Sequence, residues 1–83
     1  MKIKLEGGAE KQYRRLNEPM LGRVTRAIDG LGKDPPEGDV KPLKGKDAFR
    51  LRVGGYRILF RDMDNIRFVF KIVPRGGAYR GKK

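Results

Sequence analysis

The clearest structural pattern of the chain lies in residues 49–73, FRLRVGGYRILFRDMDNIRFVFKIV. Apolar and polar side chains alternate in it at a period of two, which is typical of β-strands with one buried face. The pair Gly54-Gly55 interrupts the alternation and suits a tight hairpin, because both residues tolerate positive φ. The run DMDN, residues 62–65, supplies a second turn. The stretch therefore predicts three consecutive antiparallel strands.

Upstream of these strands the pattern becomes helical. Residues 1–5 alternate as a short first strand, which Gly7-Gly8 is expected to break. Residues 9–16 and 19–31 carry apolar side chains at helical intervals, which predicts two helices, with Pro19 at the first position of the second and Gly32 as its stop. Residues 33–47 are rich in proline, glycine and charge, so we expect a connection without an element of its own.

The predicted order of elements indicates an α+β domain. An N-terminal strand is followed by an antiparallel helix hairpin and a three-stranded antiparallel meander, with the helices packed on one sheet face. A chain of 83 residues supports one domain, spanning residues 1–83. Arg61 and Arg67, on either side of the second turn, are expected to lie at a solvated edge beside Asp62 and Asp64.

The composition points to a polyanionic partner. Lysine and arginine number 21 against 10 acidic residues, and with no histidine the formal net charge is +11. Such an excess favours nucleic acid or an acidic protein partner. The chain has no cysteine, so disulfides and thiolate zinc sites are excluded. No apolar run approaches the roughly 18 residues of a spanning helix and no secretion signal begins the chain, so we expect a cytoplasmic protein without membrane contact.

Three segments carry a resemblance to a known family. They are FRLRVGGYRILF at 49–60, VPRGGAYR at 73–80 and PLKG at 42–45, preceded by the helix pair. Together they are similar to the bacterial and archaeal RelE/ParE toxin superfamily, which shows a basic-apolar-basic strand, a Gly-Tyr-Arg turn and a terminal Pro-Arg-Gly segment with a tyrosine. The resemblance covers nearly the whole chain.

The resemblance implies the toxin of a type II toxin–antitoxin system. A RelE-like member is an mRNA interferase, an endoribonuclease that cleaves mRNA in the ribosomal A site. The ribose 2′-hydroxyl attacks the adjacent phosphate, and neither a metal nor another cofactor is needed. The implied partners are a RelB-like antitoxin, the ribosome and mRNA.

The resemblance also assigns roles to residues of this chain. Arg50 and Arg52 match positions near the scissile phosphate, and Arg57 matches a phosphate-clamping arginine. Arg75 matches the arginine that stabilises or protonates the leaving group, and Tyr79 matches a tyrosine that stacks on or orients a base. Further RNA contacts are expected from the nearby cations Lys44, Lys46, Lys71 and Arg80.

The chemistry leaves two questions open. A guanidinium stays protonated, so the arginines do not serve as the proton acceptor for the 2′-hydroxyl. The acceptor is then a glutamate, an aspartate, a tyrosine, a lysine such as Lys44, Lys46 or Lys71, or a group of the ribosome or substrate. The alternative function is a non-catalytic binding module, either a ParE-like inhibitor of DNA gyrase or a degenerate toxin that holds RNA without cutting it.

Overall fold

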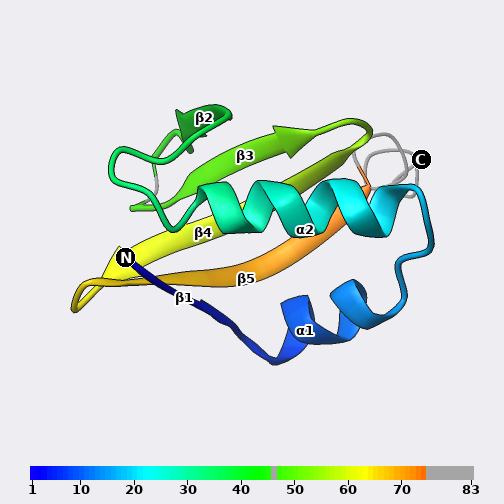
Figure 1. The fold of residues 1–83 in the computed structure, drawn as a ribbon. Coiled ribbons are helices and arrows are strands. Elements are labelled where there is room, and N and C mark those ends of the chain that lie inside the picture. The colour runs from blue at the N-terminus through cyan, green and yellow to red at the C-terminus, as the bar shows by residue number, and fades with distance from the viewer. Residues whose placement is uncertain (46, 75–83) are drawn as a thin grey trace.

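In the part of the chain that the structure describes, five strands form one sheet and two helices cover one of its faces (Figure 1). This computed structural model describes residues 1–45 and 47–74. In chain order the elements are β1 (Lys2–Leu5), α1 (Gly7–Arg14), α2 (Met20–Gly30), β2 (Asp39–Pro42), β3 (Phe49–Val53), β4 (Tyr56–Met63) and β5 (Ile66–Pro74). The sheet order is β1-β5-β4-β3-β2, with β1 parallel to β5 and the other neighbours antiparallel. The α+β class and the three-stranded meander are confirmed.

The two turns of the meander lie where the sequence predicts them. Gly54 adopts φ +57°, as a tight hairpin requires. At the second turn β4 continues through Met63, and Asp64 and Asn65 take φ values of +53° and +63°. Aspartate and asparagine tolerate this left-handed conformation better than other side chains do.

The prediction of a connection without an element over residues 33–47 is wrong at its centre. Residues 39–42 form β2, which pairs antiparallel with β3 and places Val40 opposite Leu51. Val40 packs against the core, whereas Asp39 and Lys41 on either side of it stay exposed. A single apolar residue between polar ones is too short a local signal, and the pairing with β3 is what makes this segment a strand. Pro42 ends it, as an edge strand permits.

Gly38, at the entry to β2, gives a stability prediction. Its φ is +103°, and an added Cβ would lie 2.7 Å from Cδ1 of the buried Leu51. We therefore expect Gly38→Ala to lower the free energy of unfolding by about 2–3 kcal/mol in urea titrations. Gly45→Ala is the matched control, because φ is +72° there but the new Cβ would meet nothing within 4 Å. Strain alone predicts a loss of about 1 kcal/mol at Gly45, and equal losses in both variants would contradict the clash.

Both helices differ from the prediction at their ends. Gly7 and Gly8 do not separate β1 from α1 but form the first turn of α1, so the expected start at Ala9 is wrong. The Glu6 amide still donates to the Val69 carbonyl at 2.9 Å, so the sheet runs directly into the helix. Pro19 directly precedes α2, which ends at Gly30, two residues before Gly32.

The core lies between the helices and one face of the sheet. The phenolic oxygen of Tyr13 in α1 lies 2.6 Å from Oγ1 of Thr25 in α2, so the two helices are tied side by side. The buried cluster draws on the helices, the segments that follow them and the three meander strands, and consists of Ala9, Leu16, Val24, Leu31, Leu51, Ile58, Phe60, Val69 and Ile72. The packing of both helices on one sheet face is therefore confirmed.

A β-bulge in β5 keeps this core continuous. Phe60 pairs with Val69 and Leu59 pairs with Lys71, so Phe70 has no Cα partner on β4. The extra residue shifts the alternation, and Val69 and Ile72 are therefore both fully buried although they are three residues apart.

Arg67 is buried, so the expectation that it lies at a solvated edge is wrong. Only 4% of it is exposed. Its Nη1 donates to the carbonyls of Leu31 and Lys33, both at 2.7 Å, and its Nε donates to Oδ1 of Asp62 at 3.0 Å. A cation at this position also complements the negative end of the α2 dipole. Arg67 therefore fixes the end of α2 to β5.

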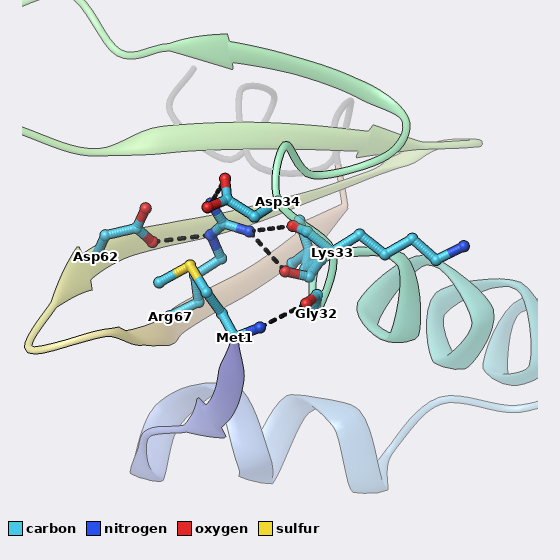
Figure 2. Close-up of polar contacts among 7 residues, drawn as sticks. Met1, Gly32, Lys33, Asp34, Asp62 and Arg67 are labelled. Carbon is cyan, nitrogen blue, oxygen red and sulfur yellow. Dashed lines mark hydrogen bonds and ion pairs between the residues drawn. The ribbon is translucent and has the colours of Figure 1, made fainter.

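The chain terminus reinforces the same junction. The amino group of Met1 donates to the Gly32 carbonyl at 2.6 Å, beside the Arg67 contacts (Figure 2). Two cations thus donate to three backbone carbonyls of the segment that follows α2.

Candidate functional site

The sheet face opposite the helices carries three of the arginines that the sequence singled out. Neighbouring side chains of a strand point to opposite faces. Because Leu51 and Ile58 are buried in the core, Arg50, Arg52 and Arg57 belong to the other face. Together with their cross-strand partners they form what we call the cationic face, made of Asp39, Lys41, Arg50, Arg52, Arg57, Leu59, Lys71 and Val73.

Strand register arranges the cationic face in two rows. The first row runs across β2, β3, β4 and β5 through Lys41, Arg50, Leu59 and Lys71. The second row runs across the same strands through Asp39, Arg52, Arg57 and Val73. Residues directly opposite on antiparallel strands have Cβ atoms about 4.5–5.5 Å apart.

The second row places two arginines directly opposite one another. Arg52 on β3 is the Cα partner of Arg57 on β4. Like charges in such a pair oppose sheet formation. Bound phosphate offsets this repulsion, because two guanidinium forks supply several donors to its oxygens. The geometry is therefore suited to an anionic ligand.

Arg50 is held by the edge strand. Its Nη1 donates to the Asp39 backbone carbonyl at 3.3 Å and lies 3.6 Å from Oδ2 of the same residue. The Arg50 side chain is 13% exposed, whereas that of Asp39 is 49% exposed. Asp39 is directly opposite Arg52 and diagonal to Arg50, so its carboxylate is close to one arginine of each row.

Arg61 marks where the cationic face ends along β4. Its Nη2 donates to Oε2 of Glu6 at 3.1 Å, and its guanidinium carbon lies 5.1 Å from the centre of the Phe70 ring. The expectation that Arg61 lies beside Asp62 and Asp64 is therefore wrong, because its partner is Glu6, the residue that follows β1. The Glu6 carboxylate pairs with this cation, as the Asp39 carboxylate does with Arg50 in the first row.

The structure brings together four of the nine residues that the sequence assigned to the site. Arg50, Arg52, Arg57 and Lys71 share the cationic face, whereas Lys44 lies exposed in the turn after β2. The other predicted site residues, Lys46, Arg75, Tyr79 and Arg80, lie outside the described residues.

Two charged residues of the cationic face were not assigned to the site from the sequence. Asp39 and Lys41 belong to β2, which was interpreted as part of a connection. The usable signal was the alternation of both with Val40, together with the prolines and glycines that bound the segment. Within residues 1–45 and 47–74, no group of three histidine, cysteine or acidic side chains could hold a metal ion, and no helix is long and apolar enough to cross a membrane.

The described part of the protein is an α+β domain with two helices, a five-stranded sheet and a polycationic sheet face. No family model and no curated protein matches the sequence. Solved structures do match. The archaeal RelE–RelB complex from Pyrococcus horikoshii OT3 shares 26% identity over 90% of this chain and 94% of that chain, with a TM-score of 0.74.

Two further structures extend the likeness. The toxin–antitoxin complex RelBE2 from Mycobacterium tuberculosis shares 23% identity over 89% of this chain and 96% of the other, with a TM-score of 0.74. The isolated E. coli RelE toxin shares 16% identity over 99% of this chain and 98% of the other, with a TM-score of 0.76. The protein is therefore RelE-like, and the resemblance seen in the sequence is confirmed at this level.

Proposed function

We propose that this protein is the toxin of a type II toxin–antitoxin pair and acts as a ribosome-dependent endoribonuclease. It cleaves mRNA in the A site by attack of a ribose 2′-hydroxyl on the neighbouring phosphate. The RelE-like fold supports the toxin class. The proposed site of action is the cytoplasm, where ribosomes translate.

The observation that carries the proposal is the direct opposition of Arg52 and Arg57 beside Arg50. Attack on a phosphodiester develops additional negative charge on the phosphorane oxygens. Cations that are already oriented stabilise this charge without reorganising, which is commonly the largest contribution to such a reaction. In this proposal Arg52 and Arg57 grip the scissile phosphate, while Arg50, Lys41 and Lys71 hold the RNA on either side.

The residues outside the described part complete the proposed site. Arg75 stabilises or protonates the leaving 5′-oxygen, and Tyr79 stacks on a base, as the resemblance implies. Aromatic stacking contributes about 1–3 kcal/mol per base. Lys46 and Arg80, together with Lys44 in the described turn after β2, add contacts to RNA.

The proposed protein partner is a RelB-like antitoxin. Two of the similar structures are complexes of RelE with RelB, and two more are the RelBE2 and the E. coli RelBE toxin–antitoxin complexes. With a formal charge of +11 on this chain, the partner segment that covers the cationic face is expected to be acidic.

The test is cleavage of a translated message. Purified protein is added to bacterial ribosomes that carry mRNA with a vacant A site, and primer extension maps the breaks. We expect breaks aligned with the A-site codon, with 2′,3′-cyclic or 3′-phosphate ends. Intact transcripts together with inhibition of supercoiling by DNA gyrase would instead favour the ParE-like alternative, and tight RNA binding without breaks would favour the degenerate toxin.

A further inference from the structure

The proposed reaction requires a proton acceptor that the arginines do not provide. The 2′-hydroxyl must lose its proton as its oxygen attacks phosphorus. A guanidinium has five donors and no acceptor site, and it stays protonated. The acceptor is therefore sought among the other side chains of the cationic face, and this inference rests on the proposed function.

Asp39 supplies a carboxylate inside the two rows. It opens the second row directly opposite Arg52, which is itself directly opposite Arg57. Its Oδ2 lies 3.6 Å from Nη1 of Arg50 at the neighbouring position of the first row. Since the Asp39 side chain remains 49% exposed, an RNA bound across the arginines can reach its carboxylate.

Two other acidic side chains close to the sheet are engaged elsewhere. Glu6 is paired with Arg61 at 3.1 Å. Asp62 is paired at 3.0 Å with Arg67, whose side chain lies in the core. Lys41 and Lys71 are the two end members of the first row. An ammonium must lose a proton before it can accept one, whereas a carboxylate can accept directly.

We infer that Asp39 is the proton acceptor for the attacking 2′-hydroxyl. One Asp39 carboxylate oxygen takes the hydroxyl proton while the 2′-oxygen forms a bond to phosphorus. The bond between phosphorus and the 5′-oxygen breaks, the 5′-oxygen takes a proton from Arg75 of the proposed site or from water, and a 2′,3′-cyclic phosphate remains. Asp39 later returns its proton to the solvent. Arg50 holds the carboxylate towards the scissile phosphate through the 3.6 Å contact.

The deciding variant is Asp39→Asn, assayed under single-turnover conditions on ribosomes with a vacant A site. We expect the cleavage rate to fall by about 10²–10⁴-fold, the usual contribution of a general base. Affinity for the ribosome–mRNA complex should stay equal or increase, because a negative charge leaves a phosphate-binding face. Arg50 keeps its hydrogen bond to the Asp39 backbone carbonyl, which the substitution does not alter. If Asp39 had only a structural role, the Asp39→Asn variant would show little change in cleavage rate, or would lose affinity for the ribosome–mRNA complex in parallel with the rate.

Asp64→Asn is the matched control. Asp64 lies exposed in the β4–β5 turn at positive φ, which asparagine also tolerates. The cleavage rate of the Asp64→Asn variant should therefore equal that of the unaltered protein. A cleavage rate for Asp39→Asn within about 3-fold of the unaltered protein would overturn the assignment while leaving the nuclease function intact. If the unaltered protein makes no breaks at all, the proposed function fails, and the role of Asp39 fails with it.

Discussion

Replacing Arg52 and Arg57 together by glutamine should lower the rate of mRNA cleavage at the ribosome by about 10³-fold or more. Loss of one oriented donor from a charge-stabilising site commonly costs about 10²–10³-fold in rate. These two arginines are directly opposite one another on β3 and β4, so both forks act on one region of the face. Single-turnover rates of the double variant and of each single variant measure the effect.

RNA binding gives an independent measure of the same pair. For single-stranded RNA, each phosphate contact that is lost should reduce the slope of log affinity against log salt by about 0.7. The double variant should therefore bind with a slope about 1.4 smaller. The exposed Lys11 and Lys33, on the helical side of the molecule, provide a control with the same change in charge. If Lys11→Gln/Lys33→Gln lowers cleavage as much as the arginine pair does, the effect is one of net charge and not of the cationic face.

Arg67→Ala should lower the free energy of unfolding by about 3 kcal/mol, because hydrogen bonds to a charged group contribute about 1.5–3 kcal/mol each. The substitution removes the donors of the Leu31 and Lys33 carbonyls at the end of α2. For a domain of this size about 3 kcal/mol corresponds to a fall in Tm of roughly 12–24 °C. Thermal unfolding followed by circular dichroism measures it.

Arg61→Ala is the comparison for Arg67. Its ion pair with Glu6 is about 40% exposed on both sides, so its loss should cost less than about 1 kcal/mol. Arg67→Lys keeps the charge but lacks the planar fork of donors. Its loss in the free energy of unfolding should lie between the losses for Arg67→Ala and Arg61→Ala. An Arg67→Ala variant no less stable than Arg61→Ala would show that the buried contacts do not hold α2 in place.

Much of the fold was predictable because its signals are local. Alternation at a period of two over residues 49–73 is a property of neighbouring side chains, and it defined β3, β4 and β5. The Gly54-Gly55 turn was equally readable, because it depends on the φ values that these residue types permit. The same alternation placed Arg50, Arg52 and Arg57 on one face.

Three features were not readable because they depend on residues far apart in the chain. β2 is a strand because β3 offers it hydrogen-bonding partners, and Asp39 enters the site only through that pairing. In the sequence Arg67 resembles a surface residue beside a turn. In the structure the segment that follows α2 packs over it and supplies two carbonyl acceptors. The bulge at Phe70 aligns Lys71 with Leu59 in the first row, and the spacing along β5 alone does not reveal it.

The sequence alone determined that this chain is an α+β domain whose sheet has an apolar face and an arginine-rich face. It could do so because strand periodicity and turn chemistry act over a few neighbouring residues. The packing of the folded chain sets three further features: Arg52 is opposite Arg57, Asp39 is opposite Arg52, and Arg67 lies in the interior. Strand register and burial decide these positions, and both depend on which distant segments pack together.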